Sequence, residues 1–233
     1  MKTLRILVCS IALWIPFSSQ AQIDEDQLGA WYMLFWNTTI NESPWGFQGD
    51  IQHRNWNIIG DLQQLMLRGG LTYKPKDANV KFTLGYAYIG GGEFGESTTI
   101  TGENRIYQEA LLPHKVGKRF LLTHRFRYEQ RFIEGREDMA TRWRYNLFLN
   151  IPFKGETLGK GIWYLALYNE IFLNGEKVDL GNGRMVEIFG VNRTYGAIGV
   201  GVANNSRIQF GYMQQTTNSI SKGQLQLSLH QKF

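Results

Sequence analysis

The chain has 233 residues, of which 43% are hydrophobic, 14% aromatic and only 19% charged, and it contains 26 glycines and one cysteine. So many aromatic residues with so little net charge exclude an intrinsically disordered chain, and beyond the N-terminus no run approaches the ~18 apolar residues that a membrane-spanning helix needs. Composition therefore leaves a β-rich chain of one domain or at most two, since all-β barrels of ~200–250 residues commonly form a single unit.

The N-terminus has the layout of a secretory signal peptide. The cations Lys2 and Arg5 precede an apolar stretch over 6–15, which is too short to span a membrane as a helix. Small residues at the two positions that a signal peptidase reads predict cleavage between Ala21 and Gln22.

This cleavage divides the chain into a signal peptide over 1–21 and an exported barrel domain over 22–233. The single cysteine, Cys9, lies in the signal peptide, so the exported chain would have no disulfide, no thiolate nucleophile and no cysteine metal ligand. Loss of Lys2 and Arg5 lowers the formal net charge from +5 to +3, which does not favour a nucleic-acid partner.

From residue 28 onward, apolar and polar residues alternate with the period of two that places successive side chains on opposite faces of a β-strand. In the segment 120–132 the even positions are mainly apolar or aromatic, whereas the odd positions from Arg125 to Arg131 are charged. The same alternation predicts eleven strands, at 28–39, 45–58, 62–74, 79–91, 103–114, 119–133, 140–153, 161–174, 190–203, 206–216 and 222–233.

The connections between these segments are of two kinds. Those between 74 and 79, 114 and 119, and 203 and 206 are short, whereas those between 91 and 103 and between 174 and 190 are long and polar. Short turns on one side and long loops on the other are typical of outer-membrane barrels. Bacterial single-chain barrels have an even number of strands, so we expect twelve strands, with ten as the alternative.

A soluble β-sandwich would show the same local alternation, but two features of the segments favour a membrane barrel. Segments such as 119–133 exceed the ~5–6 residues usual in soluble proteins and suit a tilted membrane strand of ~9–11 residues that continues into the rim. Aromatic residues lie toward the segment ends, as in the girdles of membrane barrels: Trp31, Trp45, Trp56, Trp143, Trp163, Tyr73 and Tyr212.

The last segment is the third feature, because it alternates and ends in phenylalanine: Leu225, Leu227, Leu229 and Phe233. It resembles the C-terminal signal that the barrel-assembly machinery of Gram-negative bacteria reads. Together these features predict an all-β, closed antiparallel transmembrane β-barrel, with short periplasmic turns and longer extracellular loops. We expect a monomer in the cell outer membrane, in contact with outer-membrane lipids.

Three motifs carry a resemblance to a known family. They are Gly29-Ala30-Trp31, the arginine-alternating hairpin Arg125–Arg144, and Asn192-Arg193-Thr194-Tyr195-Gly196. The chain resembles the domain-of-unknown-function 2490 family over nearly all of its exported part. The resemblance implies an uncharacterised outer-membrane barrel of Bacteroidetes-type bacteria, and it implies no catalytic residues.

The polar parity of the strands predicts a charged lumen. Its candidate lining residues are Arg54, Arg68, Arg105, Glu109, Arg125, Arg127, Glu129, Arg131, Arg142, Arg144, Glu170, Arg193 and Arg207. Arg–carboxylate pairs among them would plug a narrow barrel. Alternatively, their excess of positive charge would favour an anion-selective pore for small solutes.

Two other functions remain open at this stage. A lipid-modifying enzyme, a hydrolase or acyltransferase, needs a nucleophile beside a base, and Ser228 and His230 share a face, although that face points inward near the periplasmic end. A surface-binding barrel would act through the long loops 91–103 and 174–190. The sequence indicates no cofactor and no metal site.

Overall fold

The computed structural model describes residues 23–95, 97–175, 178–179 and 185–233, so the predicted signal peptide and its cleavage site between Ala21 and Gln22 lie outside the described residues. Within the described part, no helix is long and apolar enough to cross a membrane. The long strands are β1 (Gly29–Thr39), β2 (Trp45–Asn55), β3 (Leu62–Tyr73), β4 (Lys81–Gly92), β5 (Ile100–Val116), β6 (Phe120–Ile133), β7 (Ala140–Pro152), β8 (Trp163–Asn174), β11 (Phe189–Ala203), β12 (Ser206–Thr216) and β13 (Ser221–Lys232).

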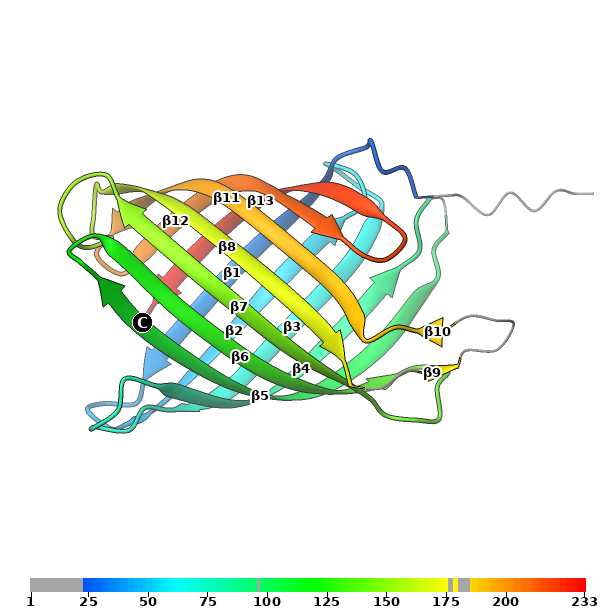
Figure 1. Ribbon diagram of the computed structural model, residues 1–233, viewed down its shortest axis with the longest axis horizontal. Coiled ribbons are helices and arrows are strands. Elements are labelled where there is room, and N and C mark those ends of the chain that lie inside the picture. Colours follow the sequence, from blue (N-terminus) through cyan, green and yellow to red (C-terminus); the bar gives the residue numbers. More distant parts are fainter. Residues whose placement is uncertain (1–22, 96, 176–177, 180–184) are drawn as a thin grey trace, which may run out of the picture.

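These strands close into one barrel in the order β1-β13-β12-β11-β8-β7-β6-β5-β4-β3-β2 (Figure 1). Neighbours run antiparallel except β1 and β13, which are parallel, with Gly29 opposite Gln224 and Asn37 opposite Lys232. The predicted all-β closed barrel is confirmed, but it has eleven strands rather than twelve and one parallel pair. An odd number suffices because a parallel pair also joins backbone N–H and C=O groups across the closing seam.

The described residues of the stretch 174–190 supply no missing barrel strand. They include the two-residue strands β9 (Val178–Asp179) and β10 (Met185–Val186), which pair only with each other. In Figure 1 this small hairpin projects beyond the rim of the barrel.

The connections alternate between the two ends of the barrel. The turn end carries 40–44, 74–80, 117–119, 153–162, 204–205 and the C-terminus, whereas the loop end carries 23–28, 56–61, 93–99, 134–139, 175–188 and 217–220. The connection 175–188 is long, as predicted, but 153–162 at the turn end is longer than 56–61 or 217–220 at the loop end. The predicted contrast between short turns and long loops therefore holds only in part.

The two faces of the sheet are opposite in character to those of a soluble β-sandwich. Leu84, Phe126 and Phe210 point outward and are 60%, 51% and 58% exposed. Glu129 and Gln224 point inward and are 1% and 0% exposed. Period-two alternation therefore encloses the polar side chains and leaves an apolar outer surface.

The tryptophans divide between the two faces. Trp45, Trp143 and Trp163 lie at or near strand ends on the outer face, where each is roughly half exposed. Trp31 does not belong to this outer girdle, because it shares the inward parity of Met33 on β1 and is 3% exposed.

Candidate functional site

The structure places all thirteen candidate lining residues on the inner face of the barrel. They are Arg54, Arg68, Arg105, Glu109, Arg125, Arg127, Glu129, Arg131, Arg142, Arg144, Glu170, Arg193 and Arg207. Asp50 and Glu103 share this face. In the described strands, ten inward arginines thus outnumber five inward carboxylates.

Glu129 on β6 is the centre of an ion-pair network. Its carboxylate accepts hydrogen bonds from Arg142 Nη2 at 2.5 Å and Arg144 Nη1 at 2.6 Å, both on the adjacent strand β7. Arg105 and Arg127 place guanidinium nitrogens 3.8 and 3.7 Å from the same carboxylate. One buried anion therefore compensates several buried cations, each of which would be costly if left alone.

Two further carboxylates extend the network. Arg144 also donates to Glu170 at 2.5 Å, and Arg125 Nη2 donates to the same carboxylate at 2.6 Å. Arg127 Nη2 donates to Glu109 at 2.5 Å. Charge-assisted hydrogen bonds join β6, β7 and β8 on their inner side, and ion pairs of 3.7–3.8 Å connect this set to the pair of Glu109 with Arg127, which joins β5 to β6.

Glu103 on β5 belongs to this network and is absent from the sequence prediction. It accepts hydrogen bonds from Arg105 Nε and Arg131 Nε, each at 2.6 Å. The signal that would have found it is parity, since Glu103 lies an even number of residues from Arg105 and Glu109 on the same strand.

Contacts between strands that are not neighbours cross the lumen. Gln48 on β2 donates to Glu109 on β5 at 2.8 Å, and Gln226 on β13 donates to the Tyr168 hydroxyl on β8 at 3.1 Å. The Arg193 guanidinium on β11 lies 4.9 Å from the ring centre of Trp31 on β1. These bridges narrow the inside of the barrel, as expected for a lumen into which long side chains project.

Aromatic rings support several of the cations. Phe172, which is 2% exposed, lies under the guanidinium groups of Arg144 and Arg193 at 4.2 and 4.5 Å from its ring centre. Trp31 supports Arg54 at 3.8 Å and donates its indole N–H to Gln63. Contacts of this kind stabilise a desolvated cation by about 2 kcal/mol or more.

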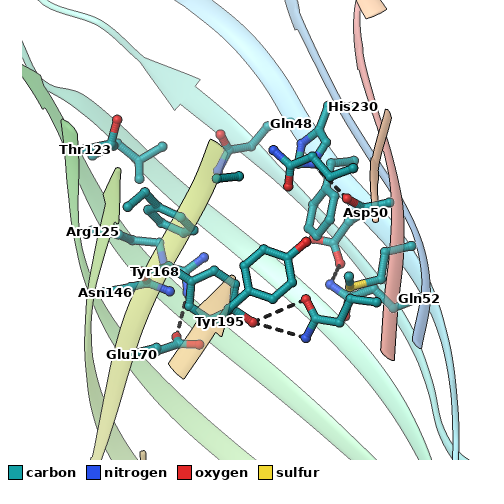
Figure 2. A pocket seen from close by; sticks show the side chains of 18 of the residues that line it. Gln48, Asp50, Gln52, Thr123, Arg125, Asn146, Tyr168, Glu170, Tyr195 and His230 are labelled. Carbon is teal, nitrogen blue, oxygen red and sulfur yellow. Dashed lines mark hydrogen bonds and ion pairs between the residues drawn. The ribbon is translucent and has the colours of Figure 1, made fainter. Parts of the chain in front are cut away.

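A cavity of about 360 Å³ lies between the network and the turn end. Figure 2 shows Arg125 and Glu170 on one side of this space and Asp50, Gln52 and His230 on the opposite side. Its polar wall includes the arginines Arg54, Arg68, Arg125, Arg127, Arg144, Arg193 and Arg207. Its apolar wall includes Trp31, Met33, Phe35, Phe148, Tyr168 and Tyr195.

Ser228 and His230, the candidate pair of an enzyme, line this cavity. Ser228 Oγ lies 3.1 Å from His230 Nε2, and the imidazole stacks on Phe35 with ring centres 4.9 Å apart. Among the described residues no carboxylate hydrogen-bonds to His230, so the orienting third group of a triad is missing.

The C-terminal segment is the closing strand of the barrel. It includes Leu225, Leu227, Leu229 and Phe233, of which Leu227 and Leu229 are 44% and 38% exposed on the outer face. The backbone N–H of Phe233 donates to Asn37 O at the turn end. Recognition of this strand by an assembly machinery stays a prediction.

Known proteins similar to this chain match it over most of the barrel. The sequence profile of a family described as "Protein of unknown function (DUF2490)" matches residues 28–226, which include every barrel strand except the end of β13. The chain belongs to this family. An uncharacterized protein of Methylorubrum extorquens is 28% identical over 225 residues, which cover 94% of this chain and 91% of that protein. No solved structure matches the chain.

Membership confirms the resemblance that the three sequence motifs carried. It also shows that the family profile covers the ion-pair network, because Glu103, Glu129 and Glu170 all lie inside residues 28–226. The Bacteroidetes-type origin implied by the resemblance stays a prediction.

Proposed function

We propose that this protein is a monomeric outer-membrane β-barrel whose arginine-rich lumen favours small anions but is closed to free flow by its own ion pairs. The observation that carries the proposal is the inversion of the two faces: aromatic and aliphatic side chains cover the outside, and a charged network fills the inside. A protein in water gains nothing from this arrangement, whereas a barrel in lipid requires it.

Closure of the sheet also supports placement in a lipid membrane. In hydrocarbon each unpaired backbone N–H or C=O costs several kcal/mol, so an open sheet edge is not tolerated. The parallel pairing of β1 with β13 removes both edges, from Gly29 to Asn37 on one strand and from Gln224 to Lys232 on the other. Outer-membrane lipids would then contact the exposed apolar side chains directly.

The charges inside the barrel support a lumen that is closed and favours anions. Positive charge exceeds negative charge inside the barrel, which lowers the barrier for anions and raises it for cations. At the same time Glu129 and Glu170 hold the arginines across the section that a solute would have to pass. We therefore expect no steady conductance from the unmodified barrel.

Substitutions by arginine on the outer face test the membrane placement. Leu84 lies within β4 and is 60% exposed, whereas Val116 ends β5 at the turn end and is 52% exposed. In lipid, Leu84→Arg should lower the free energy of unfolding by ~2–4 kcal/mol and Val116→Arg by only ~0–1 kcal/mol, because the cost falls from the midplane to the interface. Urea titration of the barrel in lipid vesicles, followed by tryptophan fluorescence, measures both values. A water-soluble barrel would tolerate the two changes equally, within about 0.5 kcal/mol.

Cysteine labelling on intact cells tests the orientation, in which the turn end faces the periplasm. Because Cys9 lies in the expected signal peptide, an introduced cysteine would be the only one in the processed chain. A membrane-impermeant maleimide should label Glu137→Cys at the loop end and leave Lys118→Cys at the turn end unlabelled until the outer membrane is opened. The reverse pattern would overturn this orientation.

A further inference from the structure

Part of the lumen charge has no carboxylate to balance it. Arg54, which is 5% exposed, donates only to the amide oxygens of Gln52 and Gln64, at 2.6–3.0 Å. Among the described residues neither Arg54 nor Arg207 forms an ion pair, and both line the cavity. A buried guanidinium without an anion is costly, so these positions favour a negatively charged ligand.

Unused hydrogen-bonding atoms lie in the same wall. Within the described part of the chain, Arg125 Nε and Arg127 Nη1 are buried without a hydrogen-bond acceptor. Each of the two atoms lies near a carboxylate but beyond hydrogen-bond distance, with Arg125 Nε 3.8 Å from Glu109 and Arg127 Nη1 3.7 Å from Glu129. Guanidinium donors of this kind match the oxygen atoms of a carboxylate or a phosphate.

Aromatic rings line the same cavity beside the arginines. Tyr168 and Tyr195 stack with ring centres 4.6 Å apart, and Phe148 lies 5.2 Å from the Arg125 guanidinium carbon. Trp31 completes this wall beside Arg54. Cationic donors beside aromatic rings fit a ligand that has both a charged head and an apolar body, and a cavity of about 360 Å³ has the size of a small-molecule site.

The charge of the two barrel ends gives the direction of entry. Exposed cations outnumber exposed acids in the turn-end connections, where Lys74, Lys76, Lys118, Arg119, Lys154 and Lys160 stand against Glu42, Asp77 and Glu156. Exposed acids gather at the loop end: Asp24, Glu25, Asp26, Glu134, Glu137 and Asp138. A mouth with an excess of one sign of charge raises the local concentration of the opposite ion, so anions would be favoured at the turn end, on the same side of the network as the cavity.

We infer that the cavity is a binding site for a small organic oxyanion, a carboxylate or phosphate on an apolar planar body, which enters from the turn end. Arg54 and Arg207 supply the compensating charge, and Trp31, Phe148 and Tyr168 contact the body. The inference deepens the proposed function and rests on it for the side from which the ligand comes. Binding itself depends only on the cavity.

Isothermal titration calorimetry tests the site on the purified full barrel in detergent. The probes are phenyl phosphate, benzoate, inorganic phosphate and neutral benzyl alcohol, and the heat of each is corrected against a titration into empty micelles. Phenyl phosphate and benzoate should bind saturably, and inorganic phosphate and benzyl alcohol at least about tenfold more weakly, because each lacks one half of the recognition. Equal binding of inorganic phosphate and phenyl phosphate would overturn the organic part of the assignment in favour of a free anion.

Two lumen variants and one matched control locate the binding. Arg54→Gln and Arg207→Gln should each weaken phenyl phosphate binding at least about tenfold, because a charge-assisted contact is lost. Both should fold, since neither change leaves a carboxylate unpaired. Arg136→Gln removes the same charge from the exposed loop end and should leave binding unchanged. Unaltered binding in both lumen variants, or no saturable binding by the unmodified barrel, would overturn the site. Neither result would bear on the membrane placement. The arginine substitutions at Leu84 and Val116 test that placement separately.

Discussion

Replacing Glu129 with glutamine is expected to lower the free energy of unfolding by about 3–5 kcal/mol, the usual cost of removing one partner from a buried ion pair. The carboxylate is 1% exposed and is the shared partner of Arg142 and Arg144. Glutamine has nearly the same volume, so the loss reports charge rather than packing. Urea unfolding in lipid vesicles, or the temperature at which the folded band disappears from an unboiled gel, measures it.

Two controls separate this effect from a general sensitivity to lost charge. Glu137→Gln lies on the exposed loop end and should change the free energy of unfolding by less than about 0.5 kcal/mol. Arg54→Gln removes a buried charge that has no carboxylate partner, so it should be close to neutral or stabilising. Similar small losses in the Glu129 and Glu137 variants would mean that the network does not hold the barrel together.

Opening the lumen is expected to have the largest functional effect. The unmodified barrel should be silent in a planar lipid bilayer, whereas the double variant Glu129→Ala with Arg144→Ala should show steady conductance. Removing both groups leaves the net charge of the lumen unchanged, and Arg142, whose ion pair in the described residues is with Glu129, is left as a further unpaired cation. Because Arg54, Arg125 and Arg207 remain in the wall, the reversal potential in a potassium chloride gradient should lie on the chloride side.

The matched control is Glu137→Ala, which should be as silent as the unmodified protein. A conducting unmodified barrel would show that the ion pairs do not close the lumen. A silent double variant would show that the bridges from Gln48 to Glu109 and from Tyr168 to Gln226 close it without them.

The strands were predictable because the period of a β-strand is local. Alternation in 119–133 and 140–153 located β6 and β7 to within two residues at each end. The number of strands was not predictable from this local signal. Whether 174–190 joins the sheet, and whether β1 meets β13 parallel or antiparallel, depends on contacts between segments far apart in the sequence.

Which residues lie on the inner face was predictable for the same reason, but which of them form ion pairs with one another was not. Parity turns Glu129 inward, but it meets Arg142 because the register of β6 with β7 sets them opposite one another. Glu103 was missed at the first residue of the predicted segment 103–114, since β5 in fact begins at Ile100. The opposite charges of the two ends emerge only once it is known which connections share an end.

An odd strand number has a consequence for how the polypeptide can be altered. Gly29 begins at the loop end and Lys232 finishes at the turn end, so the termini emerge from opposite mouths. A linker joining them would have to span the whole length of the barrel, so circular permutation through a short connection would not reach. In the membrane placement proposed above, reporter domains fused to the two ends of the barrel would accordingly be delivered to different compartments.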